Sequence, residues 1–162
     1  MEIKNSELYN IMKWSKWVGL DKLMNHPSLD SDKAYDMSLL IPELQNQMSV
    51  IEENRNRISK KIFPVNEETG EQPGILKAHD RSGKLMKGDM EATPEEIAEY
   101  STKMDEFTKE FNKVLEKEVK INGDKIEISR KKDERSGRSE LQNLNLTVTD
   151  LMILAPLITV TR

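Results

Sequence analysis

Apolar residues recur at steps of three and four along two separated segments of the chain. Such alternation keeps one edge of a helix facing a partner, as in a coiled-coil seam. The pattern therefore predicts two long helices that pair as an antiparallel hairpin, although the same heptads also allow pairing between copies of the chain. The first series is Met37, Ile41, Leu44, Met48, Ile51, Arg55, Ile58 and Ile62, and the second is Ile97, Tyr100, Met104, Phe107, Phe111 and Val114.

The first long helix is expected from Lys33 to Ile62, with Asp32 as its cap, and would be about 45 Å long. Pro42 lies inside it. A proline in a helix interior deletes a hydrogen bond, so either the helix bends there or a shorter helix precedes one that begins at Ile41. Arg55 occupies a seam position and either sets the register of pairing or reaches past the seam with its stem packed.

The second long helix has a clear start. Thr93 suits the cap, Pro94 the first helical position, and Glu96 the third position of a capping box. The charged outer face is mixed in sign, as expected for a solvated helix surface. We expect this helix to run from Pro94 to about Glu118.

Residues 65–92 form a connection much longer than a helical hairpin needs, and such loops are uncommon unless they are functional or disordered. An apolar, turn, apolar pattern from Ile75 to Met86, centred on residues 80–83, predicts a small β-hairpin that would present a contact surface. A solvated loop is the alternative. The candidate contact residues here are Leu76, Leu85 and Met86.

A short N-terminal helix is expected from Ser6 to a stop at Gly19. Trp14 and Trp17 lie three residues apart near its end. They are either an aromatic anchor for a partner or part of the packing on the helical hairpin, which is where tryptophans usually lie.

Beyond the second long helix the apolar period shortens to two. Apolar residues alternate with polar ones on both sides of Asn122-Gly123, a pair that favours a left-handed turn, so the sequence predicts a β-hairpin of residues 119–121 and 126–128. Leu144, Leu146 and Val148 alternate as in a third strand.

The chain ends on its most apolar stretch. Thr149 and Asp150 are expected to cap one or two helical turns that stop at Pro156, followed by an extended tail, 157–160. So apolar a segment must be covered, either by the helical hairpin of the same chain or by a neighbouring subunit. The candidate contact residues are Leu151, Met152, Leu154 and Leu157.

Residues 130–138 contain no apolar side chain, and five basic residues there outnumber two acids. Arg130, Lys131 and Lys132 are candidates for contact with phosphate or with an acidic partner. A solvated loop is the alternative interpretation.

Composition agrees with long solvated helices around narrow buried faces, because 33% of the 162 residues are charged and 5% are aromatic. We expect one domain, 1–162, of the mainly α (α+β) class: a long antiparallel helical hairpin with a short N-terminal helix and a small C-terminal β-hairpin or sheet. An N-terminal helix and turn would occupy residues 1–32. The helical hairpin would occupy residues 33–118, with its tip at 65–92, and a C-terminal region would follow at 119–162.

Charge and chemistry narrow the function classes. The net charge of −4 disfavours nucleic acid as a bulk partner, and the longest apolar run, 151–158, is too short to span a bilayer. The absence of cysteine and of a signal-peptide pattern suits a cytoplasmic protein. His26 and His79 stand far apart in no metal motif, and no phosphate loop or nucleophile elbow occurs. We therefore expect that the protein is not an enzyme and that it binds no cofactor and no metal.

Four segments together resemble a family of small, uncharacterised proteins encoded by tailed bacteriophages. The segments are Glu52–Ile58, Phe107–Leu115, Val119–Ile121 and Leu146–Ile158, and the resemblance covers roughly residues 20–63 and 97–158. The connection 65–92 is larger here than in the family pattern. The resemblance implies a phage origin and a role without catalysis, and it supplies no catalytic residues.

Two function classes follow. The first is a virion structural or assembly protein, located in the host cytoplasm or the virion, that binds copies of itself or other virion proteins. The second is a phage-encoded inhibitor that sequesters a host defence protein or a small ligand.

Overall fold

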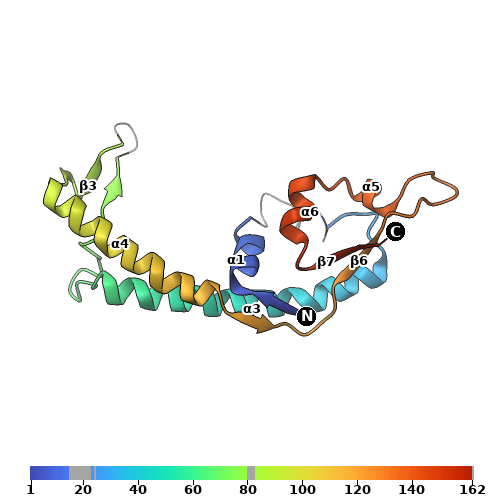
Figure 1. Ribbon diagram of the computed structural model, residues 1–162, viewed down its shortest axis with the longest axis horizontal. Helices are drawn as coiled ribbons and strands as arrows, with labels where there is room; N and C mark the ends of the chain where they lie inside the picture. The colour runs from blue at the N-terminus through green and yellow to red at the C-terminus, as the bar shows by residue number, and fades with distance from the viewer. Residues whose placement is uncertain (15–22, 24, 80–82, 162) are drawn as a thin grey trace. The chain divides into compact units, whose positions relative to one another are not determined.

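The computed structural model describes residues 1–14, 23, 25–79 and 83–161, and it is mainly helical with several short strands (Figure 1). The chain forms two compact units. Unit 1 comprises Met1–Ile51 and Leu115–Arg162, and unit 2 comprises Glu52–Val114. The expectation of a mainly helical α+β protein is confirmed.

Unit 1 holds two small sheets that each join distant parts of the chain. Strand β1 (Glu2–Lys4) pairs antiparallel with β5 (Glu118–Lys120). Strand β6 (Ile126–Ser129) pairs with β7 (Ile158–Thr161) and lies beside it in Figure 1. This second pair is parallel, so its strands need a long crossover, which helices α5 and α6 provide.

The predicted hairpin around Asn122-Gly123 is wrong, although its strands exist. A two-residue hairpin turn of type I′ needs positive φ at both central residues, and Asn122 does not have it, while Gly123 has a φ of 124°. Strand β5 pairs instead with β1, and Met1, just before β1, extends this pairing, since Ile121 N–H donates to Met1 O at 2.9 Å. Local alternation thus identified the strands but not their partners.

The expected third strand at residues 144–148 is also wrong, because two short helices lie there. Helix α5 (Glu140–Leu144) ends at Asn145, which has the left-handed conformation typical of a C-cap. Helix α6 (Val148–Leu154) begins earlier than predicted, with Thr147 and not Thr149 as its cap. The extended segment after Pro156 is confirmed as β7.

Helix α1 (Asn5–Trp14) confirms the expected N-terminal helix, and Gly19 lies outside the described residues. Helix α3 (Ser31–Ile62) continues through Pro42, so the alternative of a separate shorter helix is wrong. Its cap differs from the prediction, since Asp30 Oδ1 accepts from Asp32 N–H at 2.9 Å.

The core of unit 1 lies along one face of α3. Met37, Leu40, Leu44 and Ile51 are at most 3% exposed, because steps of three, four and seven residues bring them to the same side of a helix. Apolar residues from α1, β6, α6 and the segment after α6 are buried as well, including Leu8, Ile11, Ile128, Leu154 and Leu157.

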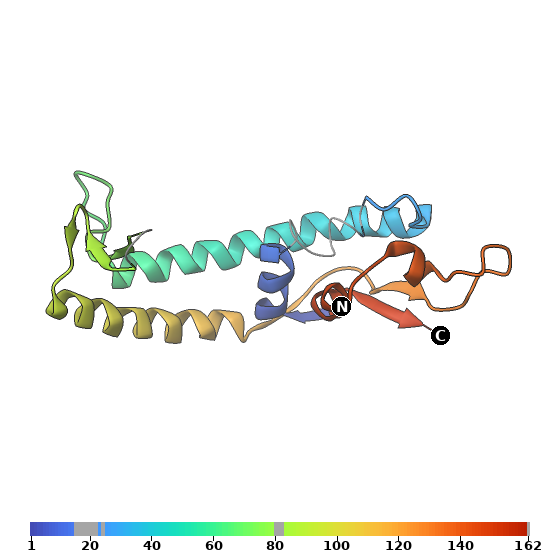
Figure 2. The ribbon, with the colours of Figure 1, turned by 90° about the horizontal axis from the view of Figure 1, so that it is seen from above.

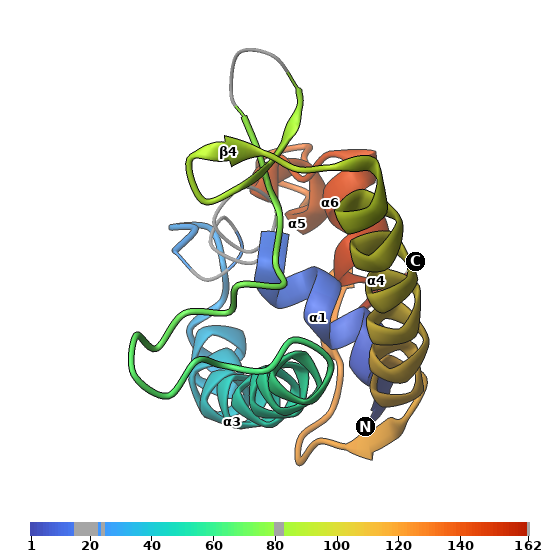
Figure 3. The same cartoon turned by 90° about the vertical axis from the view of Figure 1, so that its left-hand side faces the viewer.

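Unit 2 contains the last turns of α3, the tip and most of α4 (Pro94–Leu115). Figure 2 shows the end of α3 (green) and α4 (yellow to orange) running in opposite directions, and Figure 3 shows β4 leading into α4. The predicted capping box is present, since Glu96 N–H donates to Thr93 Oγ1 at 3.2 Å and Thr93 N–H donates to Glu96 Oε2 at 2.9 Å. The helix ends at Leu115, three residues before the expected Glu118.

The tip of unit 2 is a small antiparallel sheet of β2 (Lys77–Ala78), β3 (Leu85–Lys87) and β4 (Met90–Glu91). The predicted pairing of the first two strands is confirmed, with Lys77 opposite Met86. Gly83 has the expected positive φ, 67°, and residues 80–82 lie outside the described part of the chain. The third strand was not predicted.

The predicted seam is only partly present in unit 2. Phe111 is 8% exposed, but Ile97 is 37% exposed, and Arg55 lies exposed beside Glu52. One aromatic contact joins the end of α3 to α4, because the ring centroids of Phe63 and Tyr100 lie 5.8 Å apart, and within α4 Phe107 stacks on Phe111 at the same separation. The helices of unit 2 therefore do not form one continuous apolar seam.

Candidate interaction surfaces

The predicted contact residues divide into buried and accessible groups. Leu76, Leu154 and Leu157 are at most 6% exposed, so they belong to the core. Leu85, Met86 and Leu151 are half-buried, while the most exposed are Met152, Arg130, Lys131 and Lys132. Trp14 is the last residue of α1, but its side chain, like the whole of Trp17, lies outside the part that the structure describes.

Helix α6 is held firmly at both ends. A capping box closes its start, where Thr147 N–H donates to Asp150 Oδ2 at 2.8 Å and Asp150 N–H donates to Thr147 Oγ1 at 3.1 Å. Asp150 is 1% exposed, and Leu154 at the other end is fully buried. Burial of both residues fixes which face of α6 points away from the core.

The outward face of α6 is apolar. Val148 and Met152 are each 74% exposed, and a spacing of four residues places them next to each other on the helix surface. Two side chains of this size in solvent, on a helix whose other face is fully packed, form a candidate contact surface. We call Val148 and Met152 the α6 patch.

A second exposed apolar face lies on α3. Tyr35 is 64% exposed and Leu39 is 57% exposed, and both project opposite the buried row of Met37, Leu40 and Leu44. Neither residue was among the predicted contacts. Their spacing of four residues is visible in the sequence, but the heptad row on the same helix shows the same kind of spacing. Only the burial of each row in the structure tells which one faces the core.

The basic loop, residues 130–138, has a defined shape. Asp133 Oδ1 accepts from the N–H groups of Arg135 and Ser136 at 3.0 and 2.7 Å, and these hydrogen bonds hold the pKa of Asp133 below its ordinary value. Gly137 has a φ of 67°, and Lys132 pairs with Ser139 across the base of the loop. The loop is therefore a closed turn and not an extended tail.

The basic loop borders a hollow of about 750 Å³ in unit 1, which is also lined by Lys33 and Glu140. Lys33 Nζ donates to both carboxylate oxygens of Glu140, at 2.7 and 2.6 Å, and Ser129 N–H donates to Oε2 at 2.9 Å. Glu140 is thus fully engaged. Among the described residues the five basic side chains of the loop enter no ion pair, and they remain available to an acidic or phosphate-bearing group.

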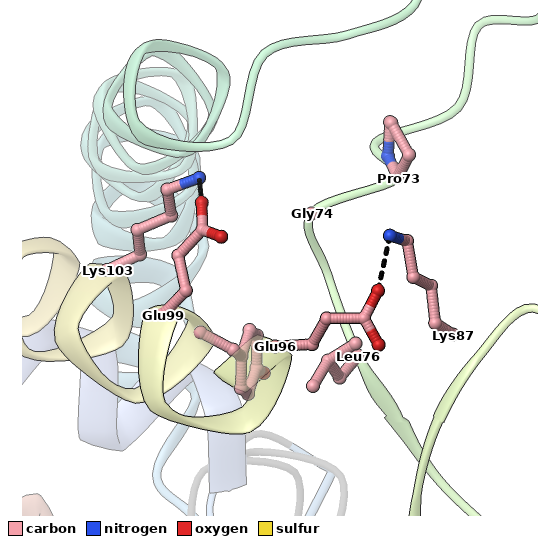
Figure 4. Close-up of a pocket in the computed structure, with 8 residues that line it drawn as sticks. Pro73, Gly74, Leu76, Lys87, Glu96, Glu99 and Lys103 are labelled. Carbon is pink, nitrogen blue, oxygen red and sulfur yellow. Dashed lines mark hydrogen bonds and ion pairs between the residues drawn. The ribbon is translucent and has the colours of Figure 1, made fainter. Parts of the chain in front are cut away.

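Unit 2 has a smaller pocket of about 200 Å³ between the tip and α4 (Figure 4). Two ion pairs stand on its walls: Lys87 Nζ lies 2.6 Å from Glu96 Oε1, and Lys103 Nζ lies 2.6 Å from Glu99 Oε1. Each lysine holds the pKa of its partner glutamate below the ordinary value, mainly through the hydrogen bond. A lowered pKa makes a carboxylate a weaker base, so these ion-paired groups are poorly suited to general acid or base chemistry.

A larger hollow of about 900 Å³ adjoins this pocket and shares Pro73, Lys87 and Glu96 with it. The Lys87–Glu96 pair therefore lies on the border between the two hollows. Met90, 73% exposed, lines the larger one. Met90 was missed by the sequence analysis, because nothing in residues 65–92 indicated the third strand that carries it.

Within the described residues, no group of three or more His, Asp or Glu side chains lies close enough together to hold a metal ion. None of the described helices is long and apolar enough to cross a membrane. Comparison with models of protein families, with curated proteins and with solved structures finds no match to this chain. The resemblance to tailed-phage proteins stays a prediction.

Proposed function

We propose that this chain is a non-enzymatic phage protein that acts through protein–protein contacts, most simply as a virion structural or assembly component in the host cytoplasm or the virion. The observation that carries the proposal is the α6 patch. Val148 and Met152 are each 74% exposed on a helix anchored by a buried capping residue. Apolar side chains presented from a rigid element are what a permanent protein contact requires.

Two further observations support a role in assembly. The outer face of α3 presents Tyr35 and Leu39 to solvent, and the incomplete seam of unit 2 leaves Ile97 of α4 accessible. Helices from another copy or from a different virion protein would cover the exposed face of α3 and the accessible part of the α4 seam. Partners of this kind need no catalytic group.

The test compares the unaltered protein with the double variant Val148→Glu/Met152→Glu. Both positions are exposed, so the circular dichroism spectrum of the variant should match that of the unaltered protein. Charged side chains in an apolar contact surface oppose association. We expect the unaltered protein to self-associate in light scattering or to co-purify with capsid or tail components, and the variant to lose that association.

Asn46→Glu is the control, because it adds a glutamate at an exposed polar position on another helix of unit 1, α3, and leaves the α6 patch unaltered. A tight monomer that never co-purifies with virion components would overturn the proposal. So would a double variant that associates as well as the control.

The second candidate is a phage-encoded inhibitor that sequesters a host protein or a small ligand. The two adjoining hollows of unit 2 favour it, since they offer Met90 and Tyr100 beside the Lys87–Glu96 pair. Capture from host lysate by the unaltered protein, lost in Met90→Glu and kept in the α6 double variant, would favour this candidate over the first.

A further inference from the structure

The connection between β5 and β6 contains the one Asn-Gly pair in the sequence, Asn122-Gly123. Gly123 has a φ of 124°, a region that other residues rarely adopt. The fold thus requires glycine at the position after Asn122. Glycine leaves its backbone nitrogen unshielded, and this makes the preceding asparagine side chain open to attack.

Glu43 of α3 holds that asparagine. Asn122 N–H donates to Glu43 Oε2 and Asn122 Nδ2 donates to Glu43 Oε1, both at 2.9 Å. The two hydrogen bonds hold the pKa of Glu43 below its ordinary value, so the clamp is a carboxylate at neutral pH. A carboxylate accepts only, and both of its oxygens are used by Asn122.

We propose that Asn122 is a deamidation site whose rate is held down by Glu43, and that deamidation irreversibly releases this connection from α3. The inference is independent of the proposed function. It rests on the clamp geometry and on the glycine that the backbone demands.

The reaction uses water and no other reagent. The Gly123 nitrogen loses its proton to solvent and bonds to Cγ of Asn122; the Cγ–Nδ2 bond breaks, and Nδ2 leaves as ammonia after taking up a proton. Water then opens the cyclic imide, giving an aspartyl or an isoaspartyl linkage. The net change is asparagine plus water to a carboxylic acid plus ammonia.

The clamp slows the first step for two reasons. Anchoring of Nδ2 prevents the rotation that would bring Cγ onto the Gly123 nitrogen, and the Glu43 charge disfavours the negative charge that develops during attack. Reaction therefore requires local opening of the connection.

The product cannot restore the clamp. The new carboxylate has no Nδ2 donor and would face the Glu43 carboxylate at hydrogen-bonding distance, where like charges repel. An isoaspartyl linkage also lengthens the backbone beside Gly123, whose carbonyl accepts a hydrogen bond from the Met1 amine at 2.8 Å. One chemical event thus weakens two attachments of the connection.

The experiment follows residue 122 in the full-length protein during incubation in mildly alkaline buffer. Trypsin cleaves after Lys120 and Lys125 and releases a peptide that contains the site. Mass spectrometry detects conversion to the acid, and chromatography separates the aspartyl from the isoaspartyl form. A synthetic peptide of residues 121–125 gives the unclamped rate.

We expect the folded protein to react at least about tenfold more slowly than the peptide, equivalent to a local opening free energy of about 1.4 kcal/mol. Glu43→Ala should bring the rate towards that of the peptide, and Glu43→Gln, which keeps one acceptor, should lie between. Asp36→Ala, which removes an exposed acid from the same helix, should leave the rate unchanged.

A second measurement tests the consequence. Asn122→Asp mimics one product and should lower the urea midpoint of unfolding, and adding Glu43→Gln should restore part of the loss, because the glutamine amide can donate to the new carboxylate. Equal rates in the unaltered protein and the peptide would overturn the proposal. An Asn122→Asp variant as stable as the unaltered protein, or a Glu43→Ala variant that ages no faster, would do so as well.

Discussion

Units 1 and 2 are stabilised in different ways. Unit 1 buries apolar side chains from both ends of the chain, such as Ile3 and Leu154, together with side chains of α3, such as Leu44. Unit 2 buries fewer among its described residues and carries several ion pairs between residues close in sequence, such as Lys103–Glu99 and Lys113–Glu110. Buried apolar area contributes far more to stability than exposed ion pairs. We therefore expect unit 1, which is assembled from distant segments, to be the more stable of the two units.

The largest expected effect is in the core of unit 1. Leu44 is fully buried, so Leu44→Ala should lower the free energy of unfolding by about 2 to 5 kcal/mol through lost burial and the cavity left behind. Leu39→Ala, on the exposed face of the same helix, should change it by less than about 0.5 kcal/mol. Urea unfolding followed by circular dichroism measures both, and similar losses would remove the distinction between the two faces of α3.

Next in size is the comparison of two capping boxes. Thr147→Ala removes the cap of α6, where the partner Asp150 is 1% exposed, and should cost about 1 to 2 kcal/mol. Thr93→Ala removes the same interaction from the solvated start of α4 and should cost about 1 kcal/mol or less. Threonine to serine at each site keeps the acceptor oxygen and serves as the control. A larger loss of unfolding free energy for Thr93→Ala than for Thr147→Ala would contradict the expectation that unit 1 is the more stable unit.

A smaller effect is expected for Arg55, which the heptad pattern places on the seam. Its guanidinium lies 3.1 Å from Glu52 Oε2 with the side chain 46% exposed. Arg55→Ala should therefore change the free energy of unfolding by less than about 0.5 kcal/mol. A loss above about 2 kcal/mol in urea unfolding would show that this position contributes to a buried interface.

The smallest effect concerns the pH dependence of unit 2, where the pKa values of Glu96, Glu99 and Glu110 are lowered by hydrogen bonds from lysines. A carboxylate with a lowered folded-state pKa contributes stability at pH values above its unfolded pKa, about 4.3, and loses it as the pH falls through the folded value. Acidification should therefore weaken these pairs.

Nuclear magnetic resonance titration of the side chains reads this effect directly. Lys87→Met should raise the pKa of Glu96 towards its ordinary value, because its main hydrogen-bond donor is gone. Glu110, paired with Lys113, serves as the internal control and should keep its lowered pKa. An unchanged Glu96 titration would mean that the Lys87 pair does not persist in solution.

Local patterns predicted the elements better than their partners. The Thr93 capping box, the pairing of residues 77–78 with 85–86 and the strands after α4 are all present. Each depends on residues within one turn or one short loop, so the sequence carries the whole signal. Strands β5 and β1 are more than a hundred residues apart in the sequence, and β6 and β7 are about thirty residues apart. Alternation of apolar and polar residues identifies a strand but does not indicate a distant pairing partner.

The contact residues show the same limit. Apolar character alone selected Leu154 and Leu157 together with Met152, and the first two are buried. Val148 was read as part of a strand, and its place beside Met152 follows only from α6 beginning at Val148. The exposure of the basic loop was easier to predict, because a run with no apolar residue is exposed in any fold.

The long helices, the capped start at Thr93 and the exposed basic loop could all be predicted from the sequence, because helical period, capping and charge act over a few neighbouring residues. The three-dimensional fold, in contrast, establishes which strands pair, which face of α6 is left in solvent and that Glu43 clamps Asn122. These depend on contacts between residues far apart in the chain, whose free energy comes from shared burial and hydrogen bonding and is not encoded in any local pattern.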